Sequence, residues 1–248
     1  MTHMLLEEYL KELKLSCFAR EYHQLAQAAL RQKQDYPDYL ESLCEREINN
    51  RRARSTERRI KHAGFPVMKS FEGFEFERVQ TLDPKVILSL AKGDWINKQE
   101  NIIAVGNSGM GKTHLSIALG ISACQLGYHV SYKGVAQLSQ ELMEAQDERT
   151  LLRYKKRLEK YDLLILDELG YVPLNKEGAE LLFDVFSSRH ECGSILVNTN
   201  LPFQEWTDVF LCPRLTGALL DRLTHRAHIL EMNGESYRLN KSMRKKGA

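Results

Sequence analysis

The segment that most constrains the fold of this 248-residue chain is Gly106-Asn-Ser-Gly-Met-Gly111-Lys112-Thr113, which fits the pattern G-x-x-x-x-G-K-[ST]. It follows an apolar run expected to be a strand, residues 101–106, and precedes an apolar run expected to be a helix, residues 114–125. A glycine-rich loop between strand and helix directs backbone N–H groups and the positive helix end toward phosphate oxygens. The sequence therefore predicts a nucleotide-binding α/β domain.

The residue types in this loop predict ATP and Mg²⁺ as its ligands. Lys112 supplies a positive charge to the β- and γ-phosphates, and the Thr113 hydroxyl is an oxygen ligand for Mg²⁺. The predicted nucleotide-binding residues are Gly106, Asn107, Ser108, Gly109, Met110, Gly111, Lys112 and Thr113.

A second motif, Leu163-Leu-Ile-Leu166-Asp167-Glu168, is an apolar strand that ends in two acids. Asp167 is expected to hold Mg²⁺, and Glu168 to polarise a water for attack on the γ-phosphate. A second acid at this point favours hydrolysis of ATP by water over the alternative of a metabolic P-loop kinase. For Glu168 the competing interpretation is a solvated acid at a strand end.

Two further positions complete the predicted catalytic set. The buried run 194–200 ends in polar amides, so either Asn198 or Asn200 is expected to sense the γ-phosphate or orient the water. Arg222, shortly before the last strand, is interpreted as an arginine finger that reaches a neighbouring subunit, with Arg226 as the alternative. The competing interpretation of Arg222 is a surface arginine paired with Asp221.

The remaining pattern predicts two domains. Residues 1–62 have apolar residues at helical spacing, broken at Asp35-Tyr36-Pro37, and residues 71–76 are expected to be a linker. Five short apolar runs, separated by helical stretches, predict a parallel sheet buried on both faces: 101–106, 129–133, 163–167, 194–199 and 227–232. We expect a small helical module over residues 1–66 and an ATPase domain over residues 67–248.

The sequences of these motifs resemble those of one protein family. GNSGMGKTHLSIALG, LLILDELGYVPL, NTNLPFQEW and LLDRLTHRAHILEMNGESYR resemble the IstB group of insertion-sequence ATP-binding proteins, relatives of DnaC-type helicase loaders within the AAA+ ATPases. LKLSCFAREY and LCEREINNRRARSTERRIKHAGFP near the N-terminus extend the resemblance over nearly the whole chain.

This resemblance implies an ATP-dependent helper of a transposase that assembles as a homo-oligomer on duplex DNA, helps to select target DNA and stimulates the transposase. It places the first sensor at Asn200 and the finger, acting in trans, at Arg222. Only residues 223–248 follow Arg222, so a full C-terminal helical lid with a second sensor is not expected. A DnaC-type helicase loader is the alternative function, and a degenerate ATP-binding scaffold is a more distant one.

The distribution of charge points to a polyanionic partner. The formal net charge is only +2, but residues 50–63, 153–160 and 238–248 carry +5, +4 and +5. The alternative for each is a solvated surface, and for the tail, residues 241–246, a disordered segment. The residues predicted to contact DNA phosphates are Arg51, Arg52, Arg54, Arg58, Arg59 and Lys61 in the first segment, and Arg153, Lys155, Lys156 and Arg157 in the second.

Composition argues against a membrane-spanning, a secreted and a disulfide-rich protein. No apolar run approaches the roughly 18 residues of a membrane span, and the N-terminus lacks a signal-peptide core. Five scattered cysteines without C-x-x-C spacing predict reduced thiols in a cytoplasmic protein, with neither a disulfide framework nor a zinc site. His225 and His228 would face opposite sides of an apparent strand, so metal binding by that pair is not expected.

Overall fold

The computed structural model describes residues 4–79 and 81–234, and its chain divides into two compact units, Met1–Arg58 and Arg59–Ala248. The division lies after Arg58, upstream of the boundary at residue 66 that the sequence predicts. The reason is that the last turn of the third helix belongs to the second unit, where Ala63 is buried and Ile60 packs in the core.

The first unit holds α1 (Met4–Glu12), α2 (Ser16–Gln32) and most of α3 (Tyr36–Ala63). The expected break is present, because Lys33 ends α2 with a left-handed φ of 54° and the Asp35 side chain accepts the N–H of Asp38 in the first turn of α3. Few apolar side chains of this unit are buried, namely Leu10, Cys17, Ala29 and Leu43.

A buried carboxylate connects α3 to the start of α2. Glu47 of α3 is 4% exposed and accepts the backbone N–H of Cys17 at 2.8 Å, where α2 begins without a side-chain cap of its own. Arg51 pairs with Glu47 at 2.7 Å and also donates to the Lys14 carbonyl at 2.9 Å. Burial opposes ionisation of Glu47, but the hydrogen bonds from Arg51 and Cys17 outweigh it and lower its pKa.

The second unit is built on a five-stranded sheet of order β2-β3-β4-β1-β5, in which every paired strand is parallel. The strands are β1 (Asn101–Val105), β2 (Val130–Gly134), β3 (Leu163–Leu169), β4 (Ser194–Thr199) and β5 (Ala227–Glu231). The predicted α/β fold class with a five-stranded parallel sheet is confirmed, and the expected strand ends agree with the observed ones to within two residues.

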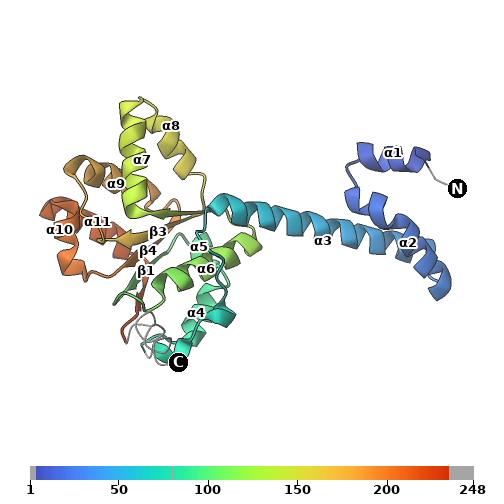
Figure 1. Cartoon of the computed structure of the whole chain (residues 1–248), viewed down its shortest axis with the longest axis horizontal. Coiled ribbons are helices and arrows are strands. Elements are labelled where there is room, and N and C mark those ends of the chain that lie inside the picture. Colours follow the sequence, from blue (N-terminus) through green and yellow to red (C-terminus); the bar gives the residue numbers. More distant parts are fainter. Residues whose placement is uncertain (1–3, 80, 235–248) are drawn as a thin grey trace, which may run out of the picture. The chain divides into compact units, whose positions relative to one another are not determined.

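Helices cover both faces of the sheet (Figure 1), and alternate residues of the strands enter two separate cores, one on each face. Ile102, Ile165 and Leu196 face one core, whereas Ile103, Leu164 and Val197 face the other. The first core contains side chains of α4 (Pro84–Leu90), α5 (Asp94–Asn97) and α6 (Lys112–Leu126). The second contains those of α7 (Val135–Asp147), α8 (Leu151–Leu158), α9 (Lys176–Arg189), α10 (Trp206–Phe210) and α11 (Pro213–Thr224).

The segment expected to be a linker is a folded part of the second unit, so that expectation is wrong. Two 3₁₀ turns, η1 (Phe71–Gly73) and η2 (Phe76–Arg78), fold residues 71–78 back on the domain, and a third, η3 (Phe203–Glu205), follows β4. Phe74 is buried, and Phe71 and Phe76 pack against the same core. Burial of these aromatic rings stabilises a segment that has no helical or strand periodicity.

Because all five strands are parallel, their carboxyl ends lie at a common edge of the sheet. In the part of the chain that the structure describes, no helix combines the length and the apolar character that crossing a membrane requires.

Candidate nucleotide site

A cleft of about 520 Å³ lies at the carboxyl ends of β1, β3 and β4. It brings together the loop after β1, the two acids at the end of β3 and the amides at the end of β4. From these three elements it is lined by Ser108, Gly109, Met110, Gly111, Lys112, Thr113, Asp167, Glu168, Asn198, Thr199 and Asn200. The three elements thus bring most of the predicted residues to one cleft, although Gly106 and Asn107 of the loop are not among its lining residues.

Two glycines let the loop approach its surroundings closely. Gly106 has a φ of 151°, and a Cβ there would lie 2.1 Å from the carbonyl oxygen of Met232. Gly111 has a φ of 91°, and its Cβ would lie 2.8 Å from the ring of Phe74. A side chain at either position would displace the loop from its packed neighbours, so the motif glycines have a steric reason here.

Lys112 begins α6, and its ammonium group lies inside the loop. Its Nζ donates to the carbonyl of Gly106 at 2.7 Å and to that of Asn107 at 2.9 Å. These contacts hold a positive charge next to the backbone N–H groups at the start of α6. The arrangement suits an anion of the size of a phosphate group.

Asp167 is only 5% exposed, and both of its carboxylate oxygens have partners. Oδ1 accepts from the side-chain amide of Asn198 at 2.9 Å and from the backbone N–H of Glu168 at 3.0 Å. Oδ2 accepts the hydroxyl of Tyr132 on β2. Burial, reinforced by the hydrogen bond to Asp167, raises the pKa of Tyr132, so this hydroxyl stays a neutral donor.

Asn198 connects the acid to the helix that follows the loop. Its amide donates to the Ser116 hydroxyl at 2.7 Å, and that hydroxyl donates to the carbonyls of Lys112 and Thr113 at 3.1 and 3.2 Å. The Oδ1 atom of Asn198 is buried and has no hydrogen-bond partner among the described residues. The oxygen donors here, the Thr113 hydroxyl and the Asp167 carboxylate, are of the type that Mg²⁺ prefers, so the residues present fit that ion.

Glu168 enters the cleft through an irregularity of β3. The register between β3 and β4 shifts between Leu166 and Leu169, and Glu168 adopts a left-handed φ of 63°. Its side chain is exposed and lines the cleft, unlike the buried residues around it. A non-glycine residue in this conformation costs energy, and such strain clusters at functional sites.

Residues 67–79 form the opposite wall of the cleft, which the sequence did not reveal. Phe74 packs edge-on against His114 of α6 with ring centroids 5.4 Å apart, and His114 also contacts the Ser70 carbonyl at 2.8 Å. The lining residues from this segment are Val67, Lys69, Gly73, Phe74, Glu75, Arg78 and Val79. This wall of the cleft therefore combines apolar side chains, such as Phe74 and Val79, with charged ones.

Of the predicted sensor and finger residues, only the sensor lies in this cleft. Asn200 is exposed at its margin, whereas Asn198 is buried against Asp167. Arg222, on α11, donates to the Ser187 hydroxyl and lies 5.0 Å from the centre of the Phe183 ring on α9. Arg226 is exposed, and its carbonyl accepts the N–H of Asn101 at 2.7 Å.

Several predicted DNA-contacting residues of α3 make contacts within the protein. Besides Arg51, Arg54 donates to the Ser16 hydroxyl at 3.1 Å, and Arg59 donates to the Cys124 carbonyl of α6 at 2.8 Å. Arg58 donates to the Arg54 carbonyl one turn earlier and remains exposed. Arg52 and Lys61 are exposed as well.

In the second basic segment, α8, Lys155 pairs with Asp184 at 2.9 Å, and Arg157 stacks on the Tyr154 ring at 4.6 Å. Arg153, Lys156 and Arg157 are exposed. The basic tail, residues 241–246, lies outside the described residues.

Comparison with known proteins identifies the family. Residues 8–245 match the model of the IstB-like ATP binding proteins of IS21 type. The chain belongs to this family. It is 38% identical over 242 residues to a Pseudomonas aeruginosa protein named as the ATP-binding protein of insertion sequence IS21, covering 98% of this chain and 91% of the relative. A Bacillus thuringiensis relative, named for insertion sequence IS232, is 33% identical over 93% of this chain and 92% of its own length.

Solved structures of DnaA and DnaI share the fold of this IstB-like chain. AMPPCP-bound DnaA from Aquifex aeolicus matches with a TM-score of 0.58 and 21% identity, over 74% of this chain and 56% of DnaA. DnaI matches with a TM-score of 0.55 and 16% identity, over 66% of this chain and 90% of DnaI. At these identities the likeness concerns the fold, and it agrees with the AAA+ core that the sequence predicts.

Proposed function

We propose that this IstB-like protein binds and hydrolyses ATP in the cleft at the carboxyl edge of its sheet. The observation that carries the proposal is the joint placement of Lys112, Asp167 and Glu168 around one cleft, with Asp167 held by two further side chains. The family description and the names of the relatives, which mention ATP binding, support the same ligand.

Each residue has a distinct role in this proposal. The loop from Gly106 to Thr113 binds the phosphates through its N–H groups, and Lys112 exchanges its loop carbonyls for phosphate oxygens. Thr113 and Asp167 hold Mg²⁺, which when bound neutralises charge on the phosphates. The apolar side chains of Phe74 and Val79 line the wall of the cleft where the base would lie.

Glu168 accepts a proton from the attacking water, because its exposed carboxylate enters the cleft beside Asp167. Tyr132 and Asn198 position Asp167, and Asn200 senses the γ-phosphate from the margin of the cleft. Arg222 lies outside the cleft of its own chain, which is the arrangement expected if it completes the site of a neighbouring subunit.

We further propose that ATP-bound subunits assemble on duplex DNA, select target DNA and stimulate a partner transposase. The exposed cations of α3 and α8 would contact phosphates, and repetition along an oligomer would multiply weak contacts. The insertion-sequence names of the relatives support transposition as the process served.

The test is DNA retention by the full chain and two variants, measured by anisotropy of a labelled duplex. Glu168→Gln should keep the protein on DNA when ATP is present, and Lys112→Ala should abolish the effect of ATP. Equal retention of the Glu168→Gln variant in ATP and ADP would contradict the proposed coupling. Copurification should recover a transposase; recovery of a hexameric helicase alone would favour a helicase loader.

A further inference from the structure

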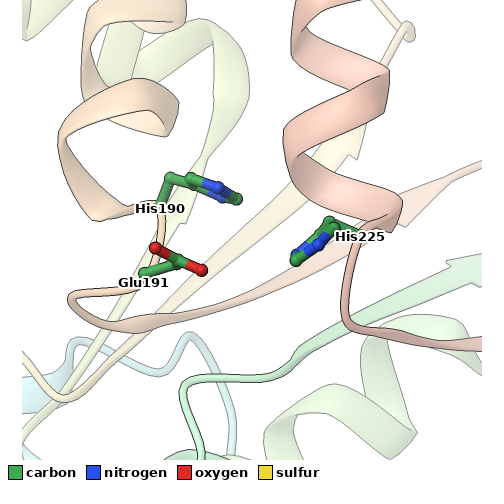
Figure 2. Close-up of side chains that lie close together, drawn as sticks. All are labelled: His190, Glu191 and His225. Carbon is green, nitrogen blue, oxygen red and sulfur yellow. The ribbon is translucent and has the colours of Figure 1, made fainter.

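A second cluster of chemically active side chains lies outside the nucleotide cleft. The ligand atoms of His190, Glu191 and His225 all lie within 4.8 Å of one another. Figure 2 shows the two imidazole rings and the carboxylate directed toward a common space between two helix ends. The rings are 5.8 Å apart at their centroids, in an edge-to-face arrangement.

The cluster lies at the opposite edge of the sheet from the cleft. His190 and Glu191 connect the end of α9 to the start of β4, and His225 connects the end of α11 to the start of β5. The expectation that His225 belongs to a strand is wrong, because β5 begins at Ala227 and His225 caps α11. His228, the other member of the pair considered from the sequence, instead contacts Glu100 at 2.7 Å.

The ligand chemistry and the local field both favour a cation. Two imidazole nitrogens and one carboxylate oxygen are a common ligand set for Zn²⁺, with water in the remaining position. His190 and His225 are the C-caps of α9 and α11, so the negative ends of two helix dipoles meet here. His190 is half-buried and the other two residues are exposed, which leaves the space open to ions from solvent.

We propose that His190, Glu191 and His225 form a binding site for a divalent transition-metal ion, with Zn²⁺ as the best match. The ion would cross-link the ends of α9 and α11. One turn earlier on the same two helices, Ser187 and Arg222 are already in contact. Bound Zn²⁺ would therefore also restrain the helix that carries Arg222, although the site itself does not depend on the nucleotide cleft.

The test is a titration of the untagged, chelator-treated full chain with Zn²⁺ in competition with a chromophoric chelator. We expect one site per chain, and at least about tenfold weaker binding in His190→Ala and in His225→Ala, since even the loss of an outer partner of a ligand costs that much. His129→Ala is the matched control, because His129 is a histidine that pairs with Asp162 elsewhere. It should bind Zn²⁺ like the unchanged protein.

Three further measurements distinguish this site from a thiolate site and from non-specific binding of the ion. Cys192 is an exposed thiol close in sequence to the cluster, so it has to be excluded as a ligand. Cys192→Ser should retain the site, and the Co²⁺ complex of the unchanged chain should show no thiolate charge-transfer band. Zn²⁺ should slow hydrogen exchange at the end of α11 in the unchanged chain but not in His190→Ala, whose circular dichroism verifies its fold. Zn²⁺ binding that persists in the double variant His190→Ala/His225→Ala, or that disappears in Cys192→Ser, would overturn the proposal.

Discussion

The nucleotide cleft and the arginine-rich helix α3 were both predicted from short stretches of sequence, but the structure places the two sets of predicted residues in different ways. In the cleft, residues at the ends of three strands that are up to 92 positions apart, Ser108 to Asn200, line one space. In α3, Arg51, Arg54 and Arg59 donate to groups outside their own helix, although Arg51 and Arg54 are also exposed. Arg52, Arg58 and Lys61 are exposed, and Arg58 donates to the Arg54 carbonyl within the helix. A motif with fixed spacing specifies which residue takes each position in a site, whereas a run of like charges specifies only the net charge of a segment.

The first test concerns the proposed general base in the cleft, Glu168. Glu168→Gln should lower ATP turnover by about a hundredfold or more, because it removes the proposed general base while leaving the loop intact. Phosphate release and nucleotide affinity measured on the same preparation check this. Glu144→Gln, an exposed carboxylate on α7, is the control. Turnover of Glu168→Gln within a factor of about three of the control would exclude this role.

A second test concerns the structural use of charge in the first unit. Glu47→Gln should weaken the start of α2 by about 2 kcal/mol, or roughly thirtyfold in the local opening equilibrium, because a buried charge-assisted cap and ion pair are lost. Hydrogen exchange of the α2 amides in the full chain measures it. Glu45→Gln, an exposed neighbour, should change little.

The same variant has a defined pH dependence. The pKa of Glu47 is lowered in the folded protein, so its contribution is complete above the ordinary glutamate pKa of about 4.3 and is lost as the pH falls through the folded value. The difference between the unchanged chain and Glu47→Gln should therefore be constant near neutral pH and shrink below about pH 4. A difference that grew on acidification would contradict this assignment.

A third test sharpens the description of the cleft at Tyr132. Tyr132→Phe removes the hydroxyl that holds Oδ2 of Asp167, and we expect about tenfold slower turnover with a higher Mg²⁺ requirement. The matched control is Tyr128→Phe, which removes a hydroxyl bonded to the Gly93 carbonyl at 3.4 Å. A changed turnover without a changed Mg²⁺ requirement would indicate that Tyr132 acts on something other than Asp167.

The smallest expected effects concern the exposed cations. Arg52→Ala and Arg58→Ala should each weaken duplex binding a few-fold and reduce the salt dependence by about one phosphate contact, without loss of stability. Arg51→Ala should instead destabilise the first unit, because it leaves Glu47 buried without its ion-pair partner. Salt titrations of DNA affinity, beside thermal unfolding, separate the two classes. If all three variants lost affinity equally at unchanged stability, the distinction drawn within α3 would be wrong.

The family and the parallel sheet could be predicted from the sequence, because motif spacing and apolar runs are properties of short, continuous segments. The sequence did not predict Tyr132, whose role requires β2 to pair with β3 so that a side chain of one strand reaches Asp167 at the end of the other. Nor did it predict the wall from residues 67–79, where Phe74 is held by contacts with α6 and η2 and not by any periodic pattern. His190 and His225 likewise meet only through the packing of α9 and α11.

In the proposed function, nucleotide bound in the cleft controls assembly on DNA. Sedimentation tests this control most directly, because it measures the mass of the complexes that the 248-residue chain forms with ATP or ADP and with or without duplex DNA. Growth to large complexes with ATP and DNA together, and smaller species in the other three conditions, is the predicted result. A monomer in all four conditions would contradict the account.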